Sequence, residues 1–201
     1  MNVNVGRSSA RGAAKTRYLI DVATGLFQKL GYGQMSLDVL VREAKVSKTT
    51  IYSRFASKAE LFNAVIQNAC AEANASATES IPELSDLQAT LRMVGRDVLD
   101  RFSQPKMAAI LFGIAEASRS DPSARRLFWD SGPGIGARII AEAINRRAPS
   151  APAFDLGNEF VLDISGVIIG RALLGFTDFD ALDLDAIVEE HVDRFFARHS
   201  L

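Results

Sequence analysis

Apolar residues recur at three- and four-residue intervals along most of the chain, which is the period of amphipathic helices rather than of strands. The first such stretch covers residues 16–30, and Gly31 and Gly33 then favour a helix end because glycine readily adopts the left-handed cap conformation. Two short helices are expected next, with Ser36 and Ser47 as their N-caps. The N-terminal part of the chain therefore predicts three helices in close succession.

The pattern beyond residue 56 predicts longer helices. Ser57 and Glu60 have the spacing of a capping box, and Ser85 with Gln88 repeats it. A break is expected at Gly132-Pro133-Gly134 because proline and glycine interrupt helices. One helix is expected to begin at residue 57. Six more are expected over about residues 85–102, 107–118, 121–131, 135–147, 154–176 and 185–199. The fold class is therefore all-α, with about nine helices.

The charges are distributed unevenly. Residues 1–58 hold ten Lys or Arg against three Asp or Glu, a net charge of +7, whereas the whole chain of 201 residues has −1. This asymmetry favours a small module that faces a polyanion, attached to a body that does not. Chance clustering of charge on a solvated face is the alternative. The composition, with 48% hydrophobic and 23% charged residues, is that of a globular protein.

The segment after Ala44 carries the most informative pattern. Three short helices with a tight second connection form a helix-turn-helix pattern, in which the third helix is exposed on one side and enters a major groove. Its apolar positions, Ile51 and Phe55, lie four residues apart and face the core. The remaining positions can hydrogen-bond phosphates or base edges: Lys48, Thr49, Thr50, Tyr52, Ser53 and Arg54. Lys58 begins the next helix, where its ammonium and backbone N–H groups suit a phosphate.

Five motifs follow one another in the first third of the chain: Arg17 to Phe27, Gly31-Tyr32, Ser36 to Leu40, Ala44 to Phe55 and Ser57 to Phe62. In this order and spacing, over about residues 15–66, the chain resembles the TetR family of bacterial transcriptional regulators. The last two helices resemble the AefR-like branch of that family. Lys45 departs from the pattern, because the family usually has glycine at this turn. A residue with a Cβ must then adopt a left-handed conformation, at a cost of about 1 kcal/mol.

The resemblance implies three parts: residues 1–14 as a flexible basic tail, 15–57 as a DNA-binding head, and 58–201 as a ligand-binding and dimerisation body. The DNA contacts that it implies are Lys48, Tyr52 and Lys58 at phosphates, Thr49, Thr50, Ser53 and Arg54 at base edges, and Ser36 and Arg17 at the backbone beside the first two helices. Two of these DNA contacts have an alternative interpretation. In the alternative for Tyr52, its ring only packs against the second helix, and in the alternative for Arg54, its charge only interacts with the dipole of its own helix. The tail, with Arg7 and Arg11, is either a minor-groove arm or a disordered segment.

The last two helices are too apolar for the surface of a monomer. The resemblance implies a dimer through them, and a head that reads two half-sites requires a two-fold axis. The expected interface residues are Ile164, Ile168, Leu173, Val188, Val192, Phe195 and Phe196. Ordinary internal core is the alternative for these positions.

Aromatic and methionine side chains between the head and the last helices suit the wall of an adaptable apolar cavity. The family would place a pocket for a small apolar or aromatic effector there, lined by Phe62, Met93, Phe102, Met107, Phe112, Phe128, Trp129 and Phe160. Each of these side chains, taken singly, fits the core as well as it fits a ligand contact.

The sequence offers little support for enzymatic chemistry, a cofactor or a metal. His191, His199 and the single cysteine, Cys70, form no nucleophile or ligand pattern, and one cysteine excludes an intramolecular disulfide. Asp178, Asp180 and Glu189 match three positions of a calcium loop, but Leu182 replaces an oxygen ligand and Asp183 replaces the turn glycine. The first residues lack the apolar region of a signal peptide, and no apolar run is long enough for a membrane span.

We therefore expect a cytoplasmic, homodimeric transcriptional repressor that binds double-stranded operator DNA and is released from a palindromic site by a small hydrophobic ligand. The alternative is a helical protein that binds or sequesters a small molecule and uses its N-terminal head for protein contacts only.

Overall fold

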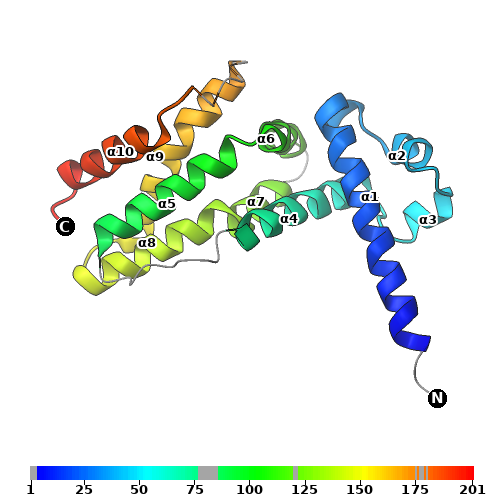
Figure 1. Ribbon diagram of the computed structural model, residues 1–201, viewed down its shortest axis with the longest axis horizontal. Coiled ribbons are helices and arrows are strands. Elements are labelled where there is room, and N and C mark those ends of the chain that lie inside the picture. The colour runs from blue at the N-terminus through cyan, green and yellow to red at the C-terminus, as the bar shows by residue number, and fades with distance from the viewer. Residues whose placement is uncertain (1–3, 77–85, 120–121, 175, 177–178, 180) are drawn as a thin grey trace. The chain divides into compact units, whose positions relative to one another are not determined.

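A computed structural model describes residues 4–76, 86–119, 122–174, 176, 179 and 181–201, with the backbone alone at 4–11, 75–76, 105 and 173. The described residues form ten helices and no strand, which confirms the all-α class (Figure 1). The helices are α1 (Asn4–Gln34), α2 (Leu37–Ala44), α3 (Lys48–Tyr52), α4 (Lys58–Ser76), α5 (Leu87–Phe102), α6 (Pro105–Ala117), α7 (Ser123–Ser131), α8 (Pro133–Arg147), α9 (Ala153–Leu173) and α10 (Leu184–Arg198). None of them is long and apolar enough to cross a membrane.

Several helix boundaries differ from the sequence pattern. α1 already includes residues 4–14, which the sequence assigns to a flexible tail. The N-cap of α5 is Asp86, whose carboxylate accepts hydrogen bonds from the first turn, while the expected cap Ser85 lies outside the described residues. The expected break falls at Gly132, between α7 and α8. α3 ends at Tyr52, so Arg54 and Phe55 follow the helix instead of completing it.

The chain forms two compact units. Unit 1 contains Met1–Ala69 and Ala109–Leu127, and unit 2 contains Cys70–Ala108 and Phe128–Leu201. Consequently α4, α6 and α7 each contribute residues to both units. These units differ from the expected division into a head of residues 15–57 and a body of residues 58–201, because each unit contains two separate segments of the chain.

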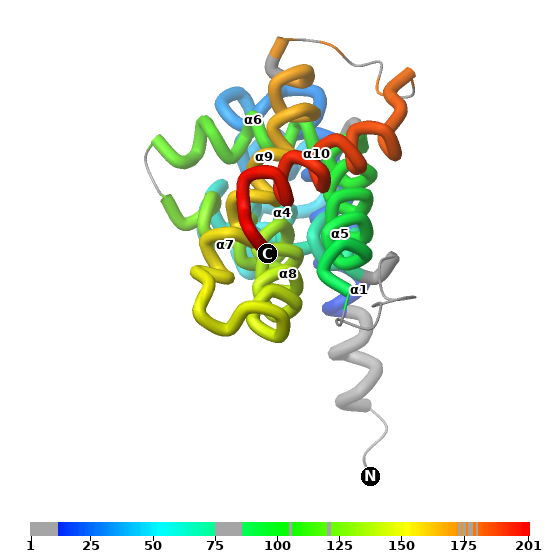
Figure 2. The backbone as a smooth tube through the Cα atoms, turned by 90° about the vertical axis from the view of Figure 1, so that its left-hand side faces the viewer, coloured from blue at the N-terminus to red at the C-terminus, as the bar shows by residue number. Residues whose placement is uncertain are grey.

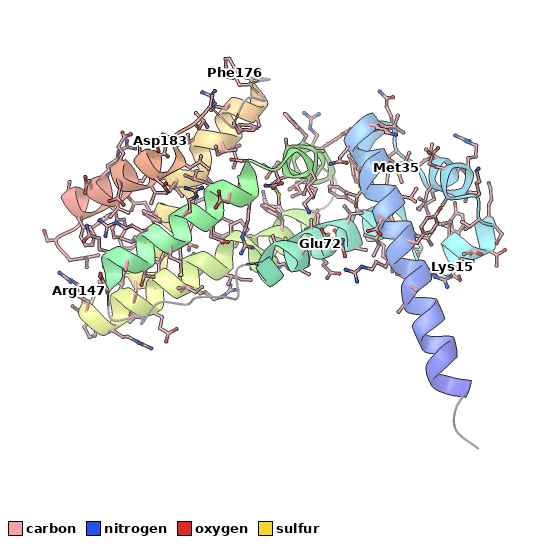
Figure 3. All side chains as sticks on the ribbon, viewed as in Figure 1. Lys15, Met35, Glu72, Arg147, Phe176 and Asp183 are labelled. Carbon is pink, nitrogen blue, oxygen red and sulfur yellow. The ribbon has the colours of Figure 1, made fainter. Side chains whose placement is uncertain are left out.

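Unit 1 has a core in which α1 packs against α2, and α2 against α3. The apolar stripe expected for α1 is buried, as are the inward positions of α2 and α3: Leu19, Ala23, Leu26, Phe27, Leu37, Leu40, Ala44 and Ile51. Met35, at the connection between α1 and α2, is 1% exposed (Figure 3). Large side chains thus hold three helices together although two of these helices are short.

Unit 2 is a bundle of α5, α8, α9 and α10, in which α9 packs against the other three and α5 also contacts α8 and α10 (Figure 2). α8 and α9 approach each other closely, because a Cβ on Gly157 would lie 2.3 Å from the carbonyl oxygen of Ala137. Ion pairs connect the outer surfaces of α5 and α10, including Arg92 Nε to Glu189 Oε1 at 2.7 Å. Close backbone contact inside and charges outside are typical of a helical bundle.

α1 is broken near its end by one glycine. Gly31 has φ 72 and ψ 170, which is a backbone region that residues with a Cβ rarely adopt, and a Cβ there would meet no atom within 4 Å. The sequence correctly placed the end of the regular helix at this point.

Substituting Gly31 by alanine should lower the free energy of unfolding by about 1–3 kcal/mol, because the cost is conformational and no packing compensates for it. Chemical denaturation followed by circular dichroism measures the effect. The control is Gly25→Ala, in the same helix and also without atoms within 4 Å of the added Cβ. It should raise stability by about 0.5–1 kcal/mol. Equal effects of the two substitutions would contradict the assigned backbone conformation.

Candidate nucleic-acid interface

The turn between α2 and α3 contains a left-handed residue that is not glycine. Lys45 has φ 52 and ψ 43, and among the described residues it is the only non-glycine residue with a positive φ. The backbone N–H of Val46 donates to the carbonyl of Val41 at 3.3 Å, a bond typical of helix ends of this type. The expectation for Lys45 is therefore confirmed.

Two serine hydroxyls hold the beginnings of α2 and α3. Ser36 Oγ accepts a hydrogen bond from Val39 N–H at 3.3 Å, and Ser47 Oγ accepts one from Thr50 N–H at 3.2 Å. A side-chain cap of this type stabilises a helix by about 1 kcal/mol. Ser36, which the family resemblance places at the DNA backbone, thus has a structural role in the free protein.

The outward face of α3 is open to solvent. Ile51 is fully buried and Phe55 is 4% exposed, as the pattern predicts. The exposed residues that were expected at DNA are Lys48, Thr49, Tyr52 and Ser53 on or directly after α3, together with Arg17 on α1 and Ser36 before α2. Thr50, Arg54 and Lys58 are half-buried. Tyr52 is 50% exposed, so half of its surface packs on the chain and half remains available to a partner.

Lys48 forms an ion pair with the neighbouring helix. Its Nζ lies 2.8 Å from Asp38 Oδ1 of α2, and the two side chains are 66% and 51% exposed. The hydrogen bond and the charge of Asp38 raise the pKa of Lys48 above its ordinary value. The cation at the start of α3 is therefore matched by a carboxylate of the same unit.

Arg54 folds back over the end of α3. Its Nη1 donates to the carbonyl of Thr50 at 3.0 Å and to Ser53 Oγ at 3.2 Å. A cation at the C-terminus of a helix satisfies carbonyls that have no partner inside the helix. In the free protein, this geometry supports the interpretation of Arg54 as a residue that completes its own helix.

Lys58 caps the end of α1 from the beginning of α4. Its Nζ donates to the carbonyls of Tyr32 and Gly33 at 2.9 and 3.3 Å and lies 4.4 Å from the centroid of the Tyr32 ring. Around it, one half of the expected capping box is present, because Ser57 Oγ accepts a hydrogen bond from Glu60 N–H at 3.1 Å, while Glu60 Oε2 accepts one from Ala56 N–H at 2.7 Å. Lys58 thus connects α4 to α1 in this structure.

Glu116 of α6 holds the same point of α1, and the sequence pattern did not identify it. Its Oε2 accepts a hydrogen bond from Gly33 N–H at 3.0 Å. The ring of Phe62 packs edge-on against Phe27 and Tyr32, with ring centroids 4.8 and 4.9 Å apart. The only signal for this contact in the sequence was the pair of glycines around Tyr32, which ends the helix. The backbone N–H and carbonyl of Gly33 then bind side chains that are distant in the sequence.

Comparison with known proteins agrees with this head. A family model described as bacterial regulatory proteins, tetR family, matches residues 19–65. A segment of 87 residues, 43% of this chain, is 36% identical to the DNA-binding transcriptional repressor TetR of Mycobacteroides abscessus. It spans 46% of that protein, so the match covers just under half the length of this curated relative.

Similarity to solved structures extends over nearly the whole chain. The flavonoid-responsive regulator FrrA is 28% identical and has a TM-score of 0.68, with 92% of this chain and 97% of that chain covered. Residues 19–65 therefore carry the sequence pattern of the tetR family. A putative TetR-family regulator from Mesorhizobium loti, 18% identical with a TM-score of 0.73 over 94% and 98% of the two chains, shares the fold. Since this is a family of regulators, the prediction that the chain is not an enzyme is confirmed.

The aromatic residues expected to line an effector pocket divide between the two units. In unit 2, the rings of Phe102 and Phe128 pack edge-to-face with centroids 6.1 Å apart, and Phe160 contacts Phe195 in the same way at 5.7 Å. Met107 is buried there as well.

The other expected lining residues have different surroundings. Met93 and Trp129 in unit 2 are half-buried. Phe62 is a core residue of unit 1, and Phe112 of α6 is 46% exposed. The pocket residues therefore stay a prediction, and the structure brings together mainly the unit 2 members of the set.

The apolar residues expected at a dimer interface are mostly core residues of unit 2. Five of them are at most 4% exposed within the single chain: Ile164, Ile168, Val188, Val192 and Phe195. Phe196 is half-buried, and the side chain of Leu173 lies outside the described residues. The stripe was correctly identified as apolar, but it packs against helices of its own chain. The exposed apolar side chains of α9 are instead Phe154 and Leu162, at 52% and 56%.

The histidines have local partners. His191 Nδ1 lies 2.8 Å from the carbonyl of Ile187, and His199 Nε2 lies 3.3 Å from Glu159 Oε1. In the part of the chain that the structure describes, no group of three or more His, Cys, Asp or Glu side chains is placed to hold a metal ion. Asp178 and Asp180 lie outside that part.

The left-handed turn yields a second test of stability. Lys45→Gly should raise the free energy of unfolding by about 0.5–1 kcal/mol, because it removes the Cβ conflict at positive φ and this gain exceeds the added entropy of the unfolded chain. Lys45→Ala removes the same charge and keeps the Cβ, so it serves as the matched control and should bring no such gain. If both variants gained equally in denaturant titrations, charge and not backbone conformation would be responsible.

Proposed function

We propose that this protein is a homodimeric, cytoplasmic transcriptional repressor that binds a palindromic DNA operator and leaves it when a small apolar or aromatic molecule binds. The observation that carries the proposal is the exposed polar face of α3 in a TetR-family head with a strongly basic N-terminal segment. Lys48, Thr49 and Tyr52 are reachable from solvent there, while Ile51 fixes the helix to the core.

In this proposal the head divides its contacts between phosphates and bases. Lys48 and Tyr52 contact phosphates, which position the protein on the duplex, while the short hydroxyl side chain of Thr49 reaches base edges. Thr50, Ser53 and Arg54 are assigned to base edges, Lys58 to a phosphate, and Ser36 and Arg17 to the DNA backbone. Arg54 and Lys58 would have to exchange carbonyl partners for DNA.

A repressor of two half-sites needs a second copy with recognition helices about 34–36 Å apart. The exposed apolar side chains of α9 supply surface for that contact, since isolated large apolar groups at more than half exposure gain free energy when a partner covers them. The interface would use Phe154 and Leu162 rather than the buried stripe of the same helix. The AefR-like character of the last helices stays part of this proposal.

Release by a ligand requires that unit 2 influence the head. α4 and α6 contribute residues to both units, and each holds Gly33 at the end of α1, through Lys58 and Glu116. A ligand that binds one arrangement of these helices better than another shifts the population of heads able to bind DNA. The similarity to FrrA, a flavonoid-responsive regulator, supports an aromatic ligand class for this chain.

DNA binding tests the proposal first. Genomic fragments retained by the wild-type protein identify its operator, and fluorescence anisotropy then measures binding to that operator and to mixed-sequence duplexes. Lys48→Ala and Tyr52→Ala should weaken binding to all sequences. Lys48→Ala should lower the salt slope by at most about 0.9 per head, which is the value for a cation without a carboxylate partner. Thr49→Ala should mainly relax base preference, by about 1–3 kcal/mol at its position.

The control for these variants is Lys29→Ala, which removes an exposed cation of α1 that the proposal does not place at DNA. If the wild-type protein bound no duplex with a salt dependence, the repressor function would be excluded. A protein that binds small molecules and uses its head for protein contacts would then be the better explanation.

Ligand binding can be followed at Trp129, the single tryptophan of the chain. A flavonoid added to the protein should change Trp129 fluorescence, raise the melting temperature and lower operator affinity over one common concentration range, because the three effects share one binding event. Phe128→Ala, which removes an aromatic partner of Phe102, should weaken all three responses together. A change in fluorescence without any change in operator affinity would separate binding from regulation.

A further inference from the structure

Four cations are assigned to DNA, and the three on or after α3, namely Lys48, Arg54 and Lys58, contact other groups of their own chain. Among the groups that these three contact, only the partner of Lys48 carries a charge. Arg54 and Lys58 donate to backbone carbonyls, which leave their positive charge in place. Lys48 lies 2.8 Å from the carboxylate of Asp38, which compensates its charge. The Lys48–Asp38 pair therefore has no net charge, whereas Arg54 and Lys58 keep their positive charge in their contacts with the chain.

A DNA phosphate can reach Lys48 in two ways, and Asp38 opposes both. If the phosphate displaces Asp38, an ion pair and its hydrogen bond are lost, and the carboxylate remains beside the duplex. If the phosphate shares the ammonium with Asp38, two anions lie on the same cation and repel each other. In either case Lys48 contributes less to the release of counterions than an unpaired lysine would.

Asp38 is held in place independently of Lys48. It lies in the first turn of α2, where a carboxylate interacts favourably with the helix dipole, and the Ser36 cap fixes that turn. α2 in turn packs on α3. The backbone that carries the Asp38 carboxylate is thus fixed beside α3 by contacts that do not involve Lys48.

We propose that Asp38 competes with DNA phosphate for Lys48 and thereby lowers the affinity of the head for duplexes of every sequence. This inference rests on the proposed DNA-binding function. Because binding to non-operator DNA depends on phosphate contacts alone, the competition shortens the time that the protein spends on such DNA.

The test uses the full-length protein and a labelled mixed-sequence duplex, so no operator needs to be known. Asp38→Asn should bind this duplex about two- to fivefold more tightly per head than the wild type, the range expected for freeing an exposed ion pair. The slope of log affinity against log salt should steepen by up to about 0.9 per head, because Lys48 then releases the counterions that its pairing with Asp38 withheld. The matched control is Glu43→Gln, which removes one exposed carboxylate from the same helix and leaves the Lys48 pair intact.

A double-mutant cycle separates competition from simple charge repulsion. In a Lys48→Met background, Asp38→Asn should strengthen binding no more than Glu43→Gln does, because no cation is left to compete for. Equal effects of Asp38→Asn and Glu43→Gln in the wild-type background would overturn the proposal, and so would a gain for Asp38→Asn that persists in Lys48→Met. A wild-type protein without salt-dependent duplex binding would instead refute the proposed function itself.

Discussion

The burial of Ile51 is the interaction on which the proposed DNA interface depends. A helix of five residues such as α3 has no stability in water by itself, because helix nucleation is unfavourable and too few hydrogen bonds follow it. Ile51 is 0% exposed and anchors α3 on the core of unit 1, while Ser47 caps its first turn. The polar side chains on the opposite face can then be presented to a partner in a fixed arrangement, without contributing to the fold.

The cations around α3 have to serve two purposes. Arg54 and Lys58 satisfy carbonyls at helix ends, where unpaired backbone groups would be costly, and Lys48 pairs with Asp38. The basic charge of the segment is thus only partly available to a polyanion at any one moment. A duplex has to compete with contacts that the free protein already makes, so the strength of DNA binding reflects these internal partners as well as the number of lysines and arginines.

Gly33 connects the head to the helices that enter both units. Its N–H is bound by Glu116 of α6 and its carbonyl by Lys58 of α4, next to the break at Gly31. Both side chains are charged and both belong to helices of which a part lies in unit 2. The end of α1 is therefore held by hydrogen bonds as well as by apolar packing, which is less directional.

The sequence by itself determined the elements whose cause is local. The apolar period gave the helices, Ser36, Ser47 and Ser57 gave their caps, and the left-handed Lys45 followed from its place in a turn that usually contains glycine. Only the tertiary structure decided which apolar stripe of α9 and α10 is core, as at Ile164 and Val192, and which cations have partners. The physical reason is that capping and periodicity involve neighbours within four residues, whereas burial and ion pairing depend on side chains that folding brings together from distant parts of the chain.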